Sequence, residues 1–520
     1  MTISLRSLSV LIATLCWFAT ASACGPAQPN QPTPDAPAPD VADSPRAVLE
    51  QQFLDMFARA YYPGRSGQIM LVPERGNILL EPDDSFYRFM HGSPWAYDVD
   101  VPLLAYGLGH IRHGVFDEPV THRDVAPIIA ALLDLPVTAT MSGKAPTTLL
   151  TDAIKPPRAV FLAVLDGART DFFDRYADTL PTFRRLRAEG AWFSGARVDY
   201  LPSLTSVGHA SIATGAEPRI HGIVANTMFD QRTGQPSGPF PETSPANLSA
   251  LTITDLWNLR SRGRAAIIAQ GTTSRATVPM AGHGGCLLNA HPTIMAMFDA
   301  VRGGWVTNDE CYRLPFYVAS DTAARVLQRR DTWLGHDVRD GRTLLRSGWF
   351  TTYQVDALVS MIERERVGQD EISDLVLANF KTLDYVGHRW GPNSDELAAA
   401  LRDLDRELGR VVAALESAAG PDGFVVIVTS DHGTPGEPEA PEQGRYYITD
   451  IIETIHNRFD PDERRTVLYY GDPADNQIFI DRSHLNDLGF NLGDIATHLE
   501  ALPFIFAAYT EDEVAAAISH

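Results

Sequence analysis

Cysteine and positive charge are both scarce in this chain. Only 4 of its 520 residues are cysteines, which excludes a small fold held together by many disulfides. Lysine and arginine together number 43, against 65 aspartates and glutamates, for a formal charge of −22. A surface of that sign repels phosphate backbones, so neither a nucleic-acid polymer nor an anionic membrane surface is an expected partner. A small phosphorylated substrate stays open, because a metal site sets its own local field.

Long apolar runs are lacking too, except near the start of the chain. Arg6 is followed by an apolar run from Leu8 to Phe18 and by small residues from Ala19 to Ala23. A positive residue, a short apolar run and a small-residue cleavage site are typical of a signal peptide, which we assign to residues 1–23. A transmembrane helix needs about 20 apolar residues, so no later segment is expected to span a membrane.

Cys24 directly follows the predicted cleavage site, and its surroundings resemble the lipid-attachment site of bacterial lipoproteins. Residues 24–45 are rich in proline, alanine and aspartate without apolar periodicity, which predicts an extended, flexible tether. A cysteine followed by a tether favours an exported lipoprotein, periplasmic or on the cell surface, with a lipid anchor on Cys24. Ordinary secretion after the same cleavage remains the alternative.

Two further cysteines, Cys286 and Cys311, would stay in the exported chain. Export places them in an oxidising compartment, where disulfides form and persist. We expect a bond between them, with two separate buried thiols as the alternative.

Buried strands alternate with amphipathic helices along the chain. The clearest helix begins near Ser394, where leucines recur at helical spacing with charges on the other face. The alternation predicts an α/β fold with a mostly parallel central sheet flanked by helices. The apolar runs that predict strands covered on both faces are Ala159–Leu165, Ala265–Ala269, Leu375–Phe380 and Phe424–Thr429, with shorter ones at Ile69–Val72 and Val101–Tyr106.

Carboxylates and imidazoles follow three of these strands, at the point where each strand ends. Asp166 comes directly after the first strand, Asp431 and His432 follow the last, and Asp384 and His388 follow the strand before it. In open α/β sheets, ligands bind at the carboxyl ends of the strands, so we expect these side chains to lie close together. Mixed oxygen and nitrogen ligands suit zinc and similar metals better than magnesium or calcium.

The segment from Leu201 to Asp230 is dominated by small residues and glycines, which allow a close backbone approach. Thr205 or Ser203 could act there as a nucleophile. A hydroxyl is a weak nucleophile unless a base or a metal activates it. Because the chain has no G-x-S-x-G motif of serine hydrolases, activation by a metal is the better interpretation.

Taken together, these motifs resemble the alkaline phosphatase superfamily, in the branch of nucleotide pyrophosphatase/phosphodiesterases and threonine-nucleophile alkaline phosphatases. Their order and spacing match the family over about residues 158–481. The motifs that carry the resemblance are Leu165-Asp166-Gly167, T-x-x-G-H at Thr205–His209, Thr214-Gly215, H-G-I-x-x-N at His221–Asn226, Asp384–His388 with Gly391-Pro392, and Ser430–Gly433.

One ligand of the family pattern is missing downstream of His432 and stands upstream instead. The family pattern ends in a histidine segment that is similar to His91-Gly92-Ser93 and its continuation through Leu103. The chain therefore resembles a circularly permuted member of the family. A separate N-terminal domain with a chance match is the alternative.

The permutation implies an order of parts along the chain. Residues 46–139 would carry the family's C-terminal part, and residues 140–157 would be a connector between its original termini. Residues 158–520 would be the main catalytic part and form one α/β domain with 46–139. The runs Ile69–Val72 and Val101–Tyr106 would then join the same sheet system as the strand that ends at Asp166. Permutation is tolerated where termini are close and exposed.

The resemblance implies two zinc ions, with other divalent metals as alternatives. Two metals clamp the attacking and leaving oxygens of an in-line displacement. Thr205 would form a phospho-threonine intermediate, and Asn226 would hydrogen-bond a non-bridging phosphate oxygen. The implied ligands are Asp384, His388 and His91 for one ion, and Asp166, Asp431, His432 and Thr205 for the other.

The substrate class depends on the segment from Thr272 to Arg275. Threonine-type phosphomonoesterases of the family carry a Lys-x-Arg pair; Arg275 matches the arginine, whereas Thr273 stands where the lysine is expected. Arg275 would bind phosphate through parallel hydrogen bonds. We narrowly favour an alkaline-phosphatase-like monoesterase over a phosphodiesterase or nucleotide pyrophosphatase. An inactive exported binding lipoprotein is a remote alternative, and no Cys-x-Pro-x-Arg motif of sulfatases is present.

Overall fold

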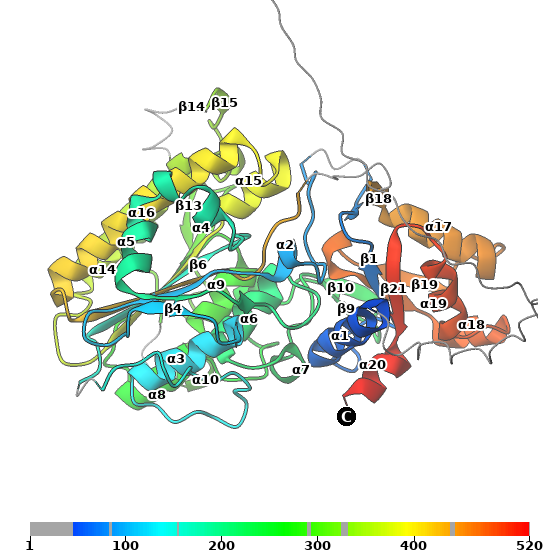
Figure 1. The fold of residues 1–520 in the computed structure, drawn as a ribbon, viewed down its shortest axis with the longest axis horizontal. Helices are drawn as coiled ribbons and strands as arrows, with labels where there is room; N and C mark the ends of the chain where they lie inside the picture. The colour runs from blue at the N-terminus through cyan, green and yellow to red at the C-terminus, as the bar shows by residue number, and fades with distance from the viewer. Residues whose placement is uncertain are drawn as a thin grey trace, which may run out of the picture. The chain divides into compact units, whose positions relative to one another are not determined.

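A mixed sheet of nine strands forms the centre of the described chain, with the order β13–β12–β11–β16–β6–β17–β3–β7–β4 (Figure 1). From β12 to β17 the neighbouring strands are parallel, whereas β3 runs antiparallel to β17. The α/β prediction with a mostly parallel central sheet is therefore confirmed. The strands are β13 (Gly304–Val306), β12 (Ile294–Asp299), β11 (Ile267–Gly271), β16 (Asp374–Phe380), β6 (Ala159–Leu165), β17 (Phe424–Thr429), β3 (Leu103–Tyr106), β7 (Ala191–Phe193) and β4 (Gly114–Phe116).

This computed structural model describes residues 45–82, 86–152, 155–288, 293–323, 331–436 and 443–518. The predicted signal peptide and all but the last residue of the predicted tether lie outside the described residues. Pro45, that last residue, begins helix α1 (Pro45–Ala60). The chain from Leu49 onward forms one compact unit.

The strands β6 and β17 have the bounds that their apolar runs predict, and every residue in both is buried. Such strands read as continuous hydrophobic runs because helices cover both faces of the sheet. Phe161 packs in the core on one face, and its neighbour Val160 packs in the core on the other.

Helices cover each face of this sheet (Figure 1). The helix expected near Ser394 is α16, whose first backbone groups are capped by the Ser394 hydroxyl, which accepts a hydrogen bond from the Leu397 amide. One face is covered by α5 (Pro181–Glu189), α14 (Gly348–Arg364), α15 (Thr382–Trp390) and α16 (Asp395–Ala419). The other is covered by α3 (Val125–Leu132), α6 (Thr205–Thr214), α8 (Ile253–Ser261) and α9 (Ser274–Ala281).

A second, antiparallel sheet has the order β19–β20–β1–β21. Its strands are β19 (Val467–Tyr470), β20 (Gln477–Ile480), β1 (Ile69–Pro73) and β21 (Ile505–Thr510). We expected the runs Ile69–Val72 and Val101–Tyr106 to join the sheet that contains the strand ending at Asp166. The expectation is correct for β3 and wrong for β1, because an apolar run predicts a strand without specifying its neighbours. Strand β1 lies between two strands from the last part of the chain.

The remaining elements are short or pack around the second sheet. Two-stranded pairs are β2 (Ile78–Leu80) with β18 (Arg445–Tyr447), β5 (Val120–Thr121) with β8 (Ala196–Arg197), β9 (Met228–Asp230) with β10 (Gln235–Ser237), and β14 (Thr332–Trp333) with β15 (His336–Asp337). The other α-helices are α2 (Ala96–Val99), α4 (Phe172–Arg175), α7 (Pro218–His221), α10 (Gly285–Leu288), α11 (Phe316–Ala319), α13 (Gly341–Leu344), α17 (Ile448–Phe459), α18 (Arg482–Asp487), α19 (Leu492–Glu500) and α20 (Glu511–Ala517). None of the helices in the described ranges is long and apolar enough to cross a bilayer.

Cys286 of α10 and Cys311 form a disulfide, with 4.6 Å between their Cα atoms. The disulfide prediction is confirmed. The bond joins α10 to the segment after β13.

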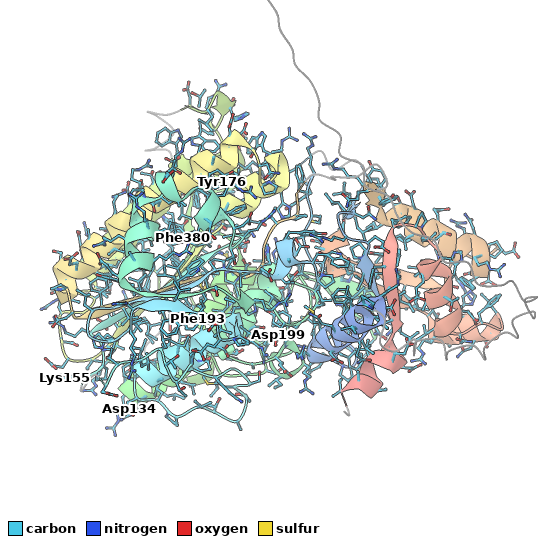
Figure 2. All side chains as sticks on the ribbon, viewed as in Figure 1. Asp134, Lys155, Tyr176, Phe193, Asp199 and Phe380 are labelled. Carbon is cyan, nitrogen blue, oxygen red and sulfur yellow. A yellow bond between two sulfur atoms is a disulfide. The ribbon has the colours of Figure 1, made fainter. Side chains whose placement is uncertain are left out.

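The expected connector at residues 140–157 contains no helix or strand in its described part, 140–152 and 155–157. Lys155 within it lies at the edge of the molecule, whereas Phe193 of β7 and Phe380 of β16 lie inside (Figure 2). The Lys155 side chain is 78% exposed.

Candidate active site

Four adjacent strands of the central sheet end at one edge, and polar residues follow each of them. The order β11–β16–β6–β17 places their carboxyl ends side by side. Arg275 follows β11, Asp384 follows β16, Asp166 follows β6, and Asp431 with His432 follows β17. The sheet therefore delivers three carboxylates and a guanidinium to a single edge.

His91 reaches the same edge by a different route. Strand β3 is antiparallel to β17, with Leu103 opposite Thr429, so the beginning of β3 lies at the carboxyl end of β17. The chain before β3 consequently arrives where Asp431 and His432 leave the sheet. Gly433 and Thr434 donate backbone hydrogen bonds to Asp98 and Tyr97 in that incoming segment.

One group of candidate ligands contains His91, Asp384 and His388. Their ligand atoms lie within 4.8 Å of one another, and all three residues are buried. Asp384 Oδ1 is 3.8 Å from His91 Nε2 and 3.1 Å from His388 Nε2. The structure thus brings together the three side chains that the sequence assigned to one metal.

The residues expected around the second metal also converge. His432 Nε2 lies 3.5 Å from Asp166 Oδ1, 3.4 Å from Asp431 Oδ2 and 3.3 Å from Thr205 Oγ1. All four side chains are buried. The seven predicted ligands therefore occupy one region, in which Asp384 neighbours both groups.

Backbone carbonyls fix the tautomers of the three candidate histidine ligands. Nδ1 of His91 is 3.0 Å from the Ser203 carbonyl, Nδ1 of His388 is 2.5 Å from the Phe89 carbonyl, and Nδ1 of His432 is 2.9 Å from the Gly433 carbonyl. A carbonyl only accepts, so each Nδ1 carries a hydrogen and the neutral ring keeps a lone pair on Nε2. This is how partners outside the coordination sphere orient metal-binding histidines.

Two carboxylate oxygens complete the argument for a metal site. Asp384 Oδ1 and Asp431 Oδ2 are buried and accept no hydrogen bond of good geometry from the described residues. Asp431 Oδ2 lies 3.3 Å from His209 Nδ1, whose hydrogen is directed at the closer Thr205 carbonyl. A buried carboxylate oxygen without a partner is costly unless it is paired or binds a metal. Lone pairs of Asp384 Oδ1 and His388 Nε2 face each other at 3.1 Å and need a cation or a proton between them. The oxygen and nitrogen donors present fit zinc and related metals.

Thr205 is the first residue of α6, and its side chain is buried beside His432. The close approach of this helix requires the glycine of the T-x-x-G-H motif. A Cβ atom added at Gly208 would lie 2.6 Å from Asp431 Cβ and 2.8 Å from the Asp431 carbonyl oxygen. Ser203, the alternative nucleophile, instead donates its hydroxyl to the Ser93 carbonyl at 3.3 Å.

Lys381 is part of the site, although the sequence reasoning missed it. It follows β16, and its Nζ lies 2.8 Å from Asp166 Oδ1, 2.8 Å from Asp384 Oδ2 and 3.2 Å from Thr205 Oγ1. Burial lowers the pKa of Lys381, but the Asp166 and Asp384 carboxylates outweigh burial and hold it above its usual range. The only signal in the sequence is a lysine placed directly after a buried strand, three residues before Asp384.

Asn379 and His209 were missed as well, and they hold the candidate ligands in place. Asn379 Nδ2 donates to Asp166 Oδ2 at 2.8 Å and to His209 Nε2 at 3.0 Å. His209 Nδ1 donates to the Thr205 carbonyl at 2.9 Å. Because both of its ring nitrogens are engaged, His209 orients its neighbours instead of offering a free lone pair.

Asn226 contacts the helix that carries Thr205. Its Oδ1 accepts hydrogen bonds from the Ser206 amide at 3.1 Å and the Ser206 hydroxyl at 3.0 Å. Its own backbone amide donates to Asp475 Oδ1 at 3.1 Å. The amide donor at Ser206 fixes the side-chain orientation, so the Asn226 NH2 group is the donor left for a ligand.

Arg275 lies in the first turn of α9. Burial lowers its pKa, whereas the negative charge of Asp472 raises it, together with Tyr385, Tyr87 and Asp384; the net shift is upward. Thr273 precedes the helix as its N-cap residue, and its Oγ1 is buried without a hydrogen bond from the described residues. The expected phosphate-binding segment therefore lies at the same sheet edge, next to the end of β16.

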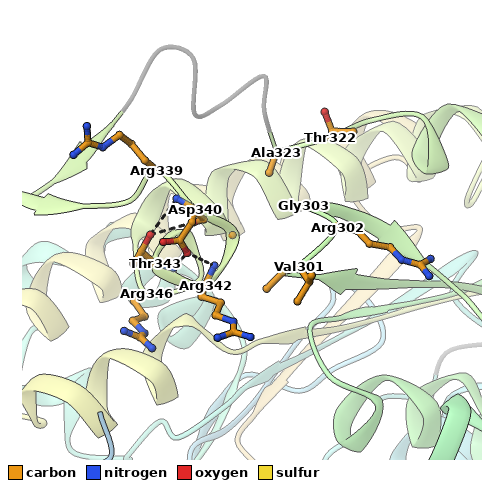
Figure 3. A pocket seen from close by; sticks show the side chains of 12 residues that line it. Val301, Arg302, Gly303, Thr322, Ala323, Arg339, Asp340, Arg342, Thr343 and Arg346 are labelled. Atoms are coloured by element: carbon orange, nitrogen blue, oxygen red, sulfur yellow. Dashed lines mark hydrogen bonds between the residues drawn. The ribbon is translucent and has the colours of Figure 1, made fainter. Parts of the chain in front are cut away.

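A cavity of about 930 Å³ lies outside this set of ligands (Figure 3). Four arginines line it together with Asp340: Arg302, Arg339, Arg342 and Arg346. Of these arginines, Arg346 lies on the side of the candidate site, and its guanidinium is 3.7 Å from the ring centroid of Phe86. The Phe86 centroid is in turn 6.5 Å from that of His388.

Comparisons with known proteins place the chain in a family. The family described as type I phosphodiesterase / nucleotide pyrophosphatase matches residues 160–498. Alkaline phosphatase PafA of Elizabethkingia meningoseptica is 25% identical over 432 residues, which are 70% of this chain and 77% of that protein. Alkaline phosphatase PhoV of Synechococcus elongatus is 25% identical over 406 residues, 66% of this chain and 72% of that protein.

The fold is also similar to a solved structure. The crystal structure of wild-type alkaline phosphatase PafA has a TM-score of 0.57 at 21% identity, covering 67% of this chain and 76% of that one. The family match spans more than half of the chain. The chain therefore belongs to the type I phosphodiesterase / nucleotide pyrophosphatase family, within the alkaline phosphatase superfamily.

Proposed function

We propose that this chain is an exported, zinc-dependent hydrolase of phosphate esters that acts through a phospho-threonine on Thr205. The observation that carries the proposal is the convergence of two ligand groups at one sheet edge, with the Thr205 hydroxyl beside them. His91, Asp384 and His388 would hold one ion. Asp166, Asp431, His432 and Thr205 would hold the other.

The chemistry follows from charge development at the phosphorus. When bound, the metal ions would neutralise charge on the attacking and leaving oxygens and lower the pKa of the attacking hydroxyl. Thr205 Oγ attacks phosphorus and gives up its proton, the ester oxygen leaves with the alcohol, and water then hydrolyses the phospho-threonine. The net reaction converts an ester and water into an alcohol and phosphate.

Three of the chain's own groups would support this attack. Lys381 Nζ donates to Thr205 Oγ1 and so favours the deprotonated hydroxyl. The Asn226 NH2 group and the Arg275 guanidinium would bind the non-bridging phosphate oxygens. Fixed donors contribute most where charge grows in the transition state.

A phosphomonoester is the favoured substrate, and a phosphodiester or nucleotide pyrophosphate is the alternative. Arg275 and the similarity to proteins named alkaline phosphatases support the monoester. The name of the matching family and the neutral Thr273 support the alternative. The remote alternative of an inactive binding lipoprotein is opposed by the complete set of ligating residue types at the site.

We also propose the circular permutation. It is supported by His91, which joins Asp384 and His388 although it comes from the segment before β3. It is further supported by strand β1, which completes a sheet with strands of the C-terminal part. In this proposal residues 46–139 and 158–520 form one domain, with 140–157 as the connector.

The proposed location outside the cytoplasm depends on residues 1–23, and the lipid anchor depends on Cys24. Mass spectrometry of the mature N-terminus would test both, since a lipid-modified Cys24 supports the lipoprotein and an uncleaved Met1 contradicts export.

The direct test of function is hydrolysis of p-nitrophenyl phosphate and bis-p-nitrophenyl phosphate by the full chain with and without added zinc. Zinc-dependent hydrolysis that is faster for the monoester than for the diester supports the favoured function. The reverse order of rates supports the alternative. A chain with bound zinc and no turnover on either would support the binding protein.

A further inference from the structure

Lys381 places its ammonium group among the candidate metal ligands. Its side chain is only 2% exposed, and its Nζ is 2.8 Å from both Asp166 Oδ1 and Asp384 Oδ2. An ammonium in that position does electrostatically what a metal ion does, because it neutralises the carboxylates it contacts.

The two ligand groups are therefore unequal. Asp166, in the second group, has both oxygens engaged, Oδ1 by Lys381 and Oδ2 by Asn379. In the first group, Asp384 Oδ1 accepts no hydrogen bond from the described residues and faces the Nε2 atoms of His91 and His388. Lys381 binds one oxygen of a carboxylate in each group, Asp384 Oδ2 and Asp166 Oδ1. The first group still offers a free oxygen on Asp384, whereas in the second group the free oxygen is on Asp431 and Asp166 offers none.

The net charge of the candidate metal site also makes the two binding steps unequal. Asp166, Asp384 and Asp431 with Lys381 carry a net charge of minus two when the histidines are neutral ligands. One divalent ion makes this buried centre neutral, and a second gives it plus two. Burial of uncompensated charge is unfavourable, so the second ion is disfavoured until an anion arrives.

We propose that Lys381 makes the second metal and the substrate bind together: the His91–Asp384–His388 group fills first, and the Asp166 group fills weakly until a phosphate dianion joins it. This inference rests on the proposed zinc-dependent function. A phosphomonoester dianion restores neutrality to the centre with two metals, whereas a diester monoanion leaves one positive charge.

The positive charge of Lys381 also bears on position 273, where a lysine is expected in a monoesterase and this chain has Thr273. Without Lys381, the centre with two metals would carry one positive charge and match a diester monoanion. With Lys381 it carries two and matches a monoester dianion, because the charge of Arg275 is offset by the neighbouring Asp472. The lysine at the end of β16 would thus supply the charge for monoesters that a lysine at position 273 would otherwise provide.

The test is a zinc titration of the metal-stripped full chain by calorimetry, with and without inorganic phosphate. Wild type should bind two ions with affinities at least about tenfold apart, and phosphate should tighten the weaker step. Lys381→Met should tighten the weaker step by about tenfold or more and reduce its response to phosphate. Lys381→Arg, which keeps the charge, is the matched control and should resemble wild type.

The alternative outcomes separate the two proposals. A wild-type chain that binds no zinc would overturn the proposed function and this inference together. Two zinc ions whose affinities and phosphate response do not change in Lys381→Met would overturn this inference alone.

If Lys381→Met does not fold, the order in which the two ligand groups bind zinc tests the inference instead. His91→Ala must remove the tight step and His432→Ala the weak one. The opposite assignment, or a weak step in wild type that ignores phosphate, would contradict the inference.

Discussion

The imidazole rings of His91 and His432 stack with 3.5 Å between their centroids and 17° between their planes. One ring precedes β3 and the other follows β17, and the antiparallel pairing of these strands brings them together. Burial lowers the pKa of His91 well below its ordinary value, and the neighbouring His432 and His388 lower it further. A neutral ring stacks on its neighbour without charge repulsion and keeps the lone pair that a metal needs.

Replacing His91 tests both the ligand set and the permutation. We expect His91→Ala to weaken zinc binding by at least about 100-fold, more than the loss of an outer partner usually costs, and to reduce turnover in parallel. Zinc content after dialysis and p-nitrophenyl phosphate hydrolysis are the measurements. His113→Ala removes an exposed histidine from the same N-terminal part and should leave both unchanged. Full zinc occupancy in His91→Ala would refute its role as a ligand.

Thr205→Ala tests the nucleophile. Loss of the hydroxyl beside His432 and Lys381 should lower kcat by roughly three orders of magnitude or more, with zinc still bound. Thr205→Ser keeps a hydroxyl at the start of α6 and should retain a substantial part of the rate. Stopped assays with p-nitrophenyl phosphate measure the rates, and more than a few per cent of wild-type turnover in the alanine variant would exclude the proposed role.

Gly208→Ala should disturb the candidate active site through a steric clash between helix α6 and Asp431. The new methyl group would meet Asp431 Cβ at 2.6 Å and the Asp431 carbonyl at 2.8 Å, so α6 or the strand end must move. We expect a loss of about 1–3 kcal/mol in the free energy of unfolding, together with weaker zinc binding. Gly195→Ala is the matched control, because no atom lies within 4 Å of the added group. Urea denaturation and zinc content are the measurements. Equal unfolding free energies and equal zinc contents in the two variants would contradict the expected clash.

The sequence predicts the central strands well because burial on both faces leaves a continuous apolar run. It also predicts the shared edge, since Asp166, Asp384 and Asp431 each follow such a run. It does not specify which strands become neighbours, and the placement of β1 in the second sheet depends on pairing with β20 and β21.

Lys381 and Asn379 could not be identified as site residues from their positions alone. A lysine just after a strand is usually solvated, and an asparagine within one usually meets a local hydrogen-bond partner. Their roles depend on Asp166, which lies on the neighbouring strand β6. Only the pairing of β16 with β6 makes these contacts predictable.

The disulfide should stabilise the fold without taking part in catalysis. Cys286 and Cys311 are separated by 25 residues, and a loop of that size gives about 3 kcal/mol in the chain-entropy account. Cys286→Ala with Cys311→Ala should lower the free energy of unfolding by about that amount and leave kcat near wild type. Urea denaturation of the oxidised wild type, its reduced form and the double variant provides the comparison, and equal stabilities of all three would contradict the expectation.

Arg275→Ala tests the choice between monoester and diester. Arg275 follows β11 at the edge shared with Asp384, where we propose that its guanidinium binds two non-bridging oxygens of a phosphate dianion. Loss of a charged hydrogen-bond donor typically costs about 2 kcal/mol, or about 30-fold in kcat/KM. We expect that fall for p-nitrophenyl phosphate and a smaller one for bis-p-nitrophenyl phosphate, whose esterified oxygens leave less charge to bind. Arg339→Ala removes an exposed arginine that pairs with Asp337 in the cavity region and should change neither value. Equal losses on both substrates would mean that Arg275 does not discriminate between them, and a larger loss on the diester would favour the phosphodiesterase.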